Sequence, residues 1–164
     1  MENKFQEFSI SDDYIRGLID GEGCFTFCNV PVYRGKEKVK LPAFALKMNE
    51  RDIDLIKKIK DQLGLRNKIY IYRQTTLKTF NSSGPKIYQR GRTATLIVRD
   101  LGQLKNIIVP FFYKKLIGHK GVQFIEWLEN IGRDPLVHED YKLIYRLYKS
   151  GFFDRDHVDY RPIR

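Results

Sequence analysis

Cysteine is scarce in this sequence: Cys24 and Cys28 are the only two, and they lie four positions apart in one short segment. This arrangement fits neither a disulfide framework nor the paired spacing of a structural zinc site. It indicates two small strand residues in a reducing compartment. Long apolar runs are also missing, which argues against a membrane span, and residues 1–13 lack the apolar stretch of a signal peptide. We expect a soluble intracellular protein, in the cytoplasm or in an organelle.

Acidic residues are in short supply relative to basic ones. The 164 residues include 30 Lys and Arg against 20 Asp and Glu, which gives a net charge of +10. A polyanionic partner follows from this excess, although charge alone fits DNA, RNA, an anionic membrane surface or a ribosomal role equally well. The basic residues are spread among aromatic and β-branched ones, so the whole chain is expected to fold.

Helix and strand signals alternate along the first part of the chain. Ser11-Asp12-Asp13 begins a helix with a hydroxyl cap and two acids in the first turn, and Gly21-Glu22-Gly23 closes it. An alternating strand follows, with Phe25 and Phe27 on one face and Cys24, Thr26 and Cys28 on the other. The further expectations are a strand at about 39–48, a helix from Asn49 to Leu63 that ends at Gly64, and strands at 68–76 and 93–99 separated by a loop at 81–85.

Three more helices are expected at 100–109, 120–131 and 138–149, punctuated by Pro110, Gly132 and Pro135. The resulting order is typical of an α+β fold with one antiparallel sheet, one face of which is left uncovered. We expect one domain over residues 1–164, with a core at about 11–131 and a helical extension at about 132–164. No internal duplication is visible, so any two-fold site must come from two chains.

The first helix carries two glycines that need an explanation, because each is less favourable than alanine by about 1 kcal/mol. At 100° per residue, Gly17 and Gly21 fall on one face beside Tyr14 and Leu18, which we call the glycine face. Such a face allows another helix to approach closely. Ile15 and Ile19 lie on a neighbouring face and are candidates for the core, which leaves the glycine face for a partner.

Glu22 ends this helix, where the helix dipole is negative and a carboxylate is disfavoured by about 0.3–1 kcal/mol. A bound cation would reverse the sign of this effect. Mg²⁺ is commonly held by one or two carboxylates, water and phosphate oxygens, and Glu22 meeting its twin across a two-fold axis fits that pattern. The alternative is a simple helix stop with a solvated Glu22; the paired glycines and the strand that follows favour the functional interpretation.

The segment YIRGLIDGEGCF resembles the LAGLIDADG motif of homing endonucleases: Gly17-Leu18-Ile19-Asp20 matches its GLID core, and Gly21-Glu22-Gly23 its closing residues. The similarity continues through FALKMNERDIDLIKKIKDQLG and through IIVPFFYKKLIGHKGVQFIEWL, which resembles the later PLxxxK segment of the family. It covers about residues 11–131, and the ordered combination is far more specific than the motif alone.

This resemblance implies a homodimeric, site-specific double-strand DNA endonuclease with an αββαββα core and a saddle-shaped antiparallel sheet. It implies hydrolysis that depends on Mg²⁺ or another divalent cation such as Mn²⁺, staggered ends, and no small-molecule substrate. The dimer interface would contain Tyr14, Gly17, Leu18 and Gly21.

The resemblance also assigns residues to the reaction. Glu22 would bind the metal beside the Gly21 carbonyl, and Lys120 would support the reaction, although a register shift of one or two would bring in His119. Met48 stands where the family often has a polar residue that holds water, so either Lys47 takes that role or solvent acts unaided. Asp20 points away from Glu22, and we assign it to holding the helix end.

Strand alternation supplies the expected DNA contacts. Phe25, Phe27, Phe44, Leu46, Ile69 and Ile71 turn inward, and the outward residues expected to read the major groove are Thr26, Cys28, Val30, Lys47, Tyr70, Tyr72 and Gln74. Arg73, Arg90 and Arg92 lie near the second hairpin's loop and can reach phosphates or guanine. The alternation leaves the face of the fourth strand open, and the target sequence is unknown.

Three other functions fit parts of this pattern. An RNA-binding intron maturase on the same scaffold would also use a basic saddle, but the acid at Glu22 favours cutting. A non-catalytic DNA-binding protein is the next alternative, and a structural ribosomal-type protein would have no need for side-chain-free positions at Gly17 and Gly21.

Overall fold

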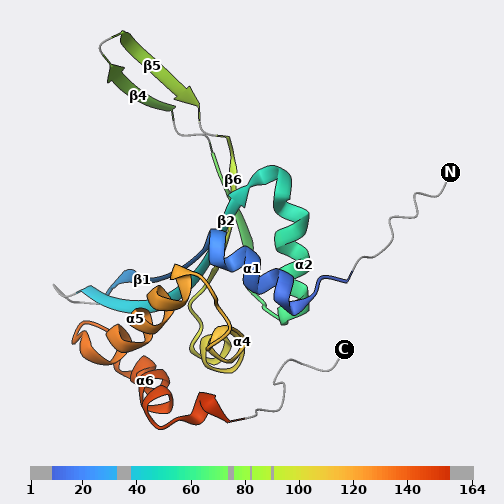
Figure 1. Cartoon of the computed structure of the whole chain (residues 1–164). Helices are drawn as coiled ribbons and strands as arrows, with labels where there is room; N and C mark the ends of the chain where they lie inside the picture. Colours follow the sequence, from blue (N-terminus) through green and yellow to red (C-terminus); the bar gives the residue numbers. More distant parts are fainter. Residues whose placement is uncertain (1–8, 33–37, 74–75, 82, 90, 156–164) are drawn as a thin grey trace.

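The computed structural model describes residues 9–32, 38–73, 76–81, 83–89 and 91–155. The first elements are α1 (Asp12–Glu22), β1 (Gly23–Pro31), β2 (Lys38–Asn49), η1 (Glu50–Asp52), α2 (Ile53–Leu63) and β3 (Ile69–Tyr72). They are followed by β4 (Thr76–Asn81), β5 (Gly84–Gln89), β6 (Thr93–Val98), α3 (Leu101–Gln103), η2 (Leu104–Ile108) and α4 (Val109–Phe112). The chain then forms α5 (His119–Arg133), η3 (Glu139–Tyr141), α6 (Lys142–Lys149) and η4 (Phe152–Asp154). This order confirms the predicted α+β class (Figure 1).

Local signals set the bounds of the first two helices. The Ser11 hydroxyl accepts a hydrogen bond from the Tyr14 amide at 3.1 Å, which caps α1 as expected. Asn49 caps the following helical turn by accepting from the Arg51 amide at 3.0 Å. Gly64 ends α2 with a φ of 72°, in the left-handed region that glycine adopts without strain.

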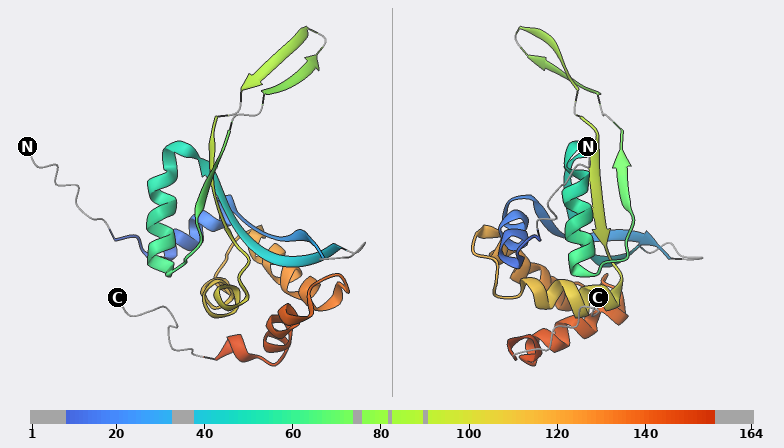
Figure 2. Two further views of the ribbon diagram at one scale, coloured as in Figure 1. Left: turned by 180° about the vertical axis from the view of Figure 1, so that it is seen from behind. Right: turned by 90° about the vertical axis from the view of Figure 1, so that its right-hand side faces the viewer.

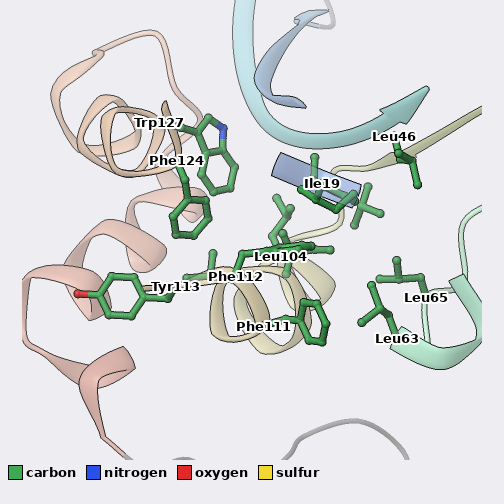
Figure 3. Packing of buried hydrophobic residues seen from close by; sticks show 14 of the residues in the cluster. Ile19, Leu46, Leu63, Leu65, Leu104, Phe111, Phe112, Tyr113, Phe124 and Trp127 are labelled. Carbon is green, nitrogen blue, oxygen red and sulfur yellow. The ribbon is translucent and has the colours of Figure 1, made fainter. Parts of the chain in front are cut away.

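Four antiparallel strands form the main sheet in the order β1-β2-β6-β3. The inward face includes Phe44, Leu46, Leu96 and Val98, all fully buried. They belong to one cluster with buried residues of α1, α2, α4 and α5, so these helices all pack on the same face of the sheet (Figures 2 and 3). Burial of this cluster is the main source of stability for the fold.

The opposite side of the sheet, the outward face, holds the alternate residues of each strand. The register pairs Cys24 with Ala45, Lys47 with Thr95, and Thr95 with Tyr70. These pairs place Thr93, Thr95 and Ile97 of β6 on the outward face, which settles the one strand whose orientation the sequence left open. None of the helices in the described part of the chain lies over this face (Figures 1 and 2).

The loop expected at 81–85 contains the turn of a second hairpin that the sequence did not indicate, because residues on both sides of it pair as strands. β4 and β5 pair antiparallel from Thr76 with Gln89 to Asn81 with Gly84. This two-stranded hairpin projects beyond the body of the molecule as a continuation of β3 and β6 (Figure 1). The predicted loop is therefore only the tip of a long ribbon.

The helix predicted at 100–109 runs further than expected, because Pro110 does not end it. Asp100 caps α3, and η2 is a turn of π-helix that leads directly into α4, which continues to Phe112. Proline lacks the amide hydrogen of a regular helical turn, and a π turn is the kind of irregularity that accommodates it. Among the described residues, no helix combines the length and the apolar content needed to cross a bilayer.

The C-terminal extension is fastened to the first half of β2. The Lys40 amide donates to the Leu136 carbonyl at 2.8 Å, and the Lys40 carbonyl accepts from the His138 amide at 3.0 Å. The Lys40 ammonium also binds the Asp134 carboxylate at 2.6 Å. Val137, Ile144 and Phe153 belong to the common buried cluster, so the extension packs on the rest of the chain.

Asp134→Asn is expected to lower the midpoint of thermal unfolding at neutral pH. The hydrogen bond from Lys40 lowers the pKa of the Asp134 carboxyl from its ordinary value of 3.8, so ionised Asp134 favours the folded state. A lowered pKa contributes stability that is complete above about 3.8 and is lost as the pH falls through the folded-state value. The midpoints of the two proteins, measured by circular dichroism, should therefore converge as the pH drops below that point. A difference that persists unchanged in acid would contradict an ionic origin.

Candidate functional site

One face of α1 is buried and the opposite face is open. Ile15 and Ile19 are fully buried, as predicted for core residues. Gly17 and Gly21 are exposed, and a Cβ atom built on either glycine would have nothing within 4 Å. No described residue therefore covers the glycine face, and a partner can approach it.

The two larger residues of the glycine face differ in their surroundings. Leu18 is half-buried and packs against the core. Tyr14 is 49% exposed and borders a hollow of about 460 Å³ between the beginning of α1 and the beginning of α2. The hollow is lined by Ser9, Ile10, Ser11, Tyr14, Asp54, Leu55 and Lys58. Tyr14 thus lies at one end of the glycine face, with the glycines between it and Glu22.

The other end of α1 carries the candidate metal ligand. Glu22 is the last helical residue and is exposed, and the last turn contains no basic residue to balance it. The next residue must be glycine: a Cβ on Gly23 would lie 2.4 Å from the Ile19 Cγ2 atom and 2.9 Å from the Ile19 carbonyl oxygen. This close approach turns the chain sharply from α1 into β1 and holds Glu22 at the edge of the sheet.

Lys47 and Met48 have different environments. Gly23 and Leu46 form the last pair of the β1–β2 ladder. Glu22 and Lys47 are the residues just beyond that pair, so they lie at the same end of the two strands. Lys47 is exposed on the outward face, whereas Met48 alternates with it and packs against the core. Met48 is thus turned away from this surface, and Lys47 is placed where it can act beside Glu22.

Asp20 binds a segment that is distant in the sequence. Its two carboxylate oxygens accept hydrogen bonds from the amides of Ile117 and Gly118, each at 3.2 Å. These amides belong to the α4–α5 loop, residues 113–118, just before α5 begins. Asp20 therefore holds the end of α1, as assigned, by joining it to the beginning of α5.

The beginning of α5 has the opposite electrostatic character from the end of α1. Its first turn contains no acidic residue, and its N-cap, Gly118, provides no side-chain hydrogen bond. His119 and Lys120 occupy the first two helical positions, where the helix dipole is positive and an anion is favoured. Asp20 therefore links a helix end suited to a cation to one suited to a phosphate.

Lys115 is a basic residue that the sequence-based assignment missed. It is exposed in the α4–α5 loop, and its amide donates to the Phe112 carbonyl at 3.0 Å. Counted from Pro110, the spacing PxxxxK ends at Lys115 and not at Lys120. The spacing alone was therefore enough to identify it, and both lysines flank the two residues that Asp20 binds.

The predicted DNA-contacting residues lie mainly on or beside the outward face. Thr26, Cys28 and Val30 alternate with inward residues of β1, and the Trp127 indole donates to the Thr26 carbonyl at 2.8 Å, which secures α5 to this strand. Tyr70 and Tyr72 are 54% and 51% exposed. Arg73 is exposed just after β3.

Arg92, just before β6, and Thr95, in the middle of β6, differ in whether their polar atoms have a partner. Arg92 lies 3.6 Å from a Glu50 carboxylate oxygen, so part of its charge is balanced within the chain. The Thr95 hydroxyl, in a residue only 5% exposed, has no hydrogen-bond partner among the described residues. Gln74 and Arg90 lie outside the described residues.

The donor set of one chain is too small for a complete metal site. Among the described residues, no three His, Cys, Asp or Glu side chains come together. Glu22 supplies one carboxylate and Gly21 one neighbouring carbonyl. Mg²⁺ retains water and often binds through one or two carboxylates and substrate phosphates, so this set fits Mg²⁺ once substrate phosphates, with or without a second carboxylate, complete the ligands.

Comparison with known proteins gives concordant results. The family model for LAGLIDADG endonuclease matches residues 15–131. Among solved structures, the I-LtrWI LAGLIDADG homing endonuclease bound to target DNA is 30% identical, with a TM-score of 0.54 over 73% of this chain and 36% of that chain. I-SmaMI bound to an uncleaved DNA target with calcium ions is 20% identical, with a TM-score of 0.55 over 86% of this chain and 44% of that one. The homing endonuclease I-TnaI is also 20% identical and has a TM-score of 0.52 over 87% of this chain and 98% of that one.

Proposed function

The chain belongs to the LAGLIDADG endonuclease family, and on that premise we propose that it is a site-specific, double-strand DNA endonuclease that works as a homodimer and leaves staggered ends. The observation that carries this proposal is the uncovered glycine face of α1, which ends at exposed Glu22 beside the outward face of the sheet. The substrate places the enzyme inside the cell, in the cytoplasm or in an organelle with its own genome.

The lengths of the matched structures and the small number of metal ligands in one protomer both support a homodimer. This chain spans less than half of the first structures it matches, 36% of I-LtrWI and 44% of I-SmaMI in the calcium-bound structure, so those proteins have room for a second unit of similar size. One protomer offers a single helix-end carboxylate where a metal site needs more ligands. Packing of the glycine faces would bring the second Glu22 to the two-fold axis and complete the set.

The residues around Glu22 support hydrolysis of a phosphodiester. Glu22 and the Gly21 carbonyl would hold Mg²⁺ or Mn²⁺, which supplies neutralisation of phosphate charge and acidification of a water molecule. The positive end of α5, with Lys120 in its first turn, would bind the scissile phosphate from the other side. Lys47, at the Glu22 end of β2, would orient the water or the phosphate by its charge.

The outward face provides the surface for the duplex. No helix of the described residues covers it, and its strands β1, β2 and β3 present Thr26, Cys28, Val30, Lys47, Tyr70 and Tyr72. A pair of antiparallel strands from this sheet can enter the major groove and read base edges. Arg73 and Arg92 lie at one end of this surface, where they can reach the backbone, and the net charge of +10 favours the polyanion.

Lys120→Met is expected to slow single-turnover cleavage by about a hundredfold or more, because a charge that stabilises the transition state is removed. Binding of the duplex should fall far less. Lys115→Met is the informative companion, and Lys58→Met, exposed on α2, is the control. Loss of cleavage in Lys115→Met, with Lys120→Met unaffected, would transfer the role to Lys115.

Recovery of cleaved sites from a randomised duplex library tests the proposed function. The purified protein with Mg²⁺ should produce double-strand breaks that share one approximately palindromic sequence, since two identical protomers read it. Cleavage should stop when the divalent cation is chelated. A protein that binds DNA in this assay but never cuts it would be a non-catalytic DNA-binding protein, and the nuclease proposal would be wrong.

A further inference from the structure

Ile117 is the most exposed large hydrophobic residue in the described part of the chain. It is 97% exposed, whereas the other exposed large hydrophobic residues range from 41% to 54%. Leaving an isoleucine side chain in water forgoes the free energy that its burial would contribute, so this position does not stabilise the isolated chain.

The exposure of Ile117 is fixed by its surroundings. Its amide donates to one Asp20 oxygen, and the Gly118 amide donates to the other, each at 3.2 Å. On the other side, Leu116 packs against the core and the Lys115 amide donates to the Phe112 carbonyl. The α4–α5 loop is thus held at both ends, and its apolar tip points away from the protein.

The neighbours of Ile117 favour a polyanionic partner over a second protein surface. Lys115, His119 and Lys120 flank it, and the first turn of α5 contains no acid. If two copies met along their glycine faces, two such basic loops would approach each other and repel. A DNA duplex would neutralise both loops and cover both isoleucines.

The position of the loop selects the minor groove. Asp20 ties it to the last turn of α1, so in the proposed dimer both loops lie near the two-fold axis. Closely packed helices lie about 8–10 Å apart, and glycines allow a closer approach. Two Glu22 carboxylates at that spacing can reach phosphates that face each other across the minor groove, about 6 Å wide, but not across the major groove, about 12 Å wide.

We propose that Ile117 is an apolar wedge that enters the minor groove at the centre of the target and partly unstacks a base step there. This inference rests on the proposed function, because it needs the duplex to lie across the dimer axis. Apolar side chains inserted between base steps kink DNA in this way, and pyrimidine–purine steps yield most easily. Ile117 would therefore select central bases by their deformability, without a hydrogen bond to any of them.

A duplex recovered from the randomised library, by cleavage or by binding, provides the test. The duplex is made in two versions, one with a TA step at its centre and one with an AA step. In each version, the fluorescent base 2-aminopurine at the central step reports unstacking. Wild-type protein should brighten the fluorescence on binding and prefer the TA version by about tenfold. Ile117→Ala and Ile117→Ser should lose most of both effects. Leu136→Ser, which alters a 50% exposed residue of the extension, is the control and should behave as wild type.

Three outcomes separate the explanations. Wild-type fluorescence and step preference in Ile117→Ala would overturn the wedge while leaving the nuclease intact. Dissociation of Ile117→Ser into protomers without DNA, measured by sedimentation, would show that Ile117 contacts the second copy, which also overturns it. A wild-type protein that neither binds nor cuts any duplex would contradict the proposed function and therefore the wedge as well. A wild-type protein that binds DNA without cutting it would contradict only the nuclease activity, and the fluorescence test of the wedge could still be carried out.

Discussion

Glu22→Gln is expected to reduce cleavage by about a thousandfold or more, equivalent to about 4 kcal/mol of transition-state stabilisation, because the substitution removes the carboxylate charge that holds the cation. The effect should be this large because Glu22 is the only acid that the described part of α1 exposes beside the outward face at this end of the sheet. Glutamine preserves the size of the side chain and leaves the fold unchanged, since Glu22 makes no described contact within the protomer. Single-turnover cleavage of the recovered target in Mg²⁺ measures the loss.

Binding of the duplex distinguishes loss of the metal site from loss of the DNA surface. Without divalent cations, Glu22 repels the phosphates, so Glu22→Gln should bind at least as tightly as the wild type in a chelating buffer. Glu126→Gln is the matched control, because it removes an exposed acid of α5 away from this end of the sheet. Full activity of Glu22→Gln, or an equal loss in Glu126→Gln, would contradict the assignment of the metal site.

Local chemistry made much of the first half of the fold predictable. The Ser11 cap, the left-handed Gly64 and the alternating phenylalanines of β1 each act within a few residues, and each is found where the sequence indicated it. The resemblance to the family is confirmed by the match over residues 15–131. Patterns of this kind are reliable because their physical cause lies within one element.

The features that the sequence did not indicate depend on pairing between distant segments. The turn-forming residues around Gly84 were correctly associated with a change of direction, but only their pairing partners show that they form the tip of the β4–β5 hairpin. The face of β6 likewise follows from its register with β2 and β3. A single strand gives the alternation of its residues but not which set faces the core.

Asp20 illustrates the same point within the candidate site. A helical wheel shows correctly that Asp20 and Glu22 diverge. It cannot show that the Ile117 and Gly118 amides, nearly a hundred positions away, donate hydrogen bonds to the Asp20 carboxylate. This contact joins the helix end suited to a cation to the helix end suited to a phosphate. The charged residues, Glu22 and Lys120, could be identified from the sequence. That they lie at helix ends joined to each other follows only from the fold.

Gly17→Leu is expected to convert the proposed dimer into protomers and to abolish specific DNA binding with it. Within one protomer the new side chain meets no obstacle, because nothing lies within 4 Å of a Cβ atom at this position. In the dimer the same side chain would lie between two helices in close contact, and overpacking of this kind costs about 1–3 kcal/mol at each of the two symmetry-related positions. Sedimentation velocity at micromolar concentration, without DNA, measures the change directly.

Gly17→Ala provides a sharper test, because its two effects have opposite signs. Alanine is favoured over glycine inside a helix by about 1 kcal/mol, so the substitution should stabilise an isolated protomer. It should weaken the dimer, because even a methyl group separates two backbones that need bare glycines to meet. Gln123→Leu is the control for Gly17→Leu, because it adds a leucine at an exposed position of α5 and should leave the dimer unchanged. A Gly17→Ala protein that is more stable and equally dimeric would show that the glycine face is not the contact between protomers, and the second Glu22 would then have no route to the shared site.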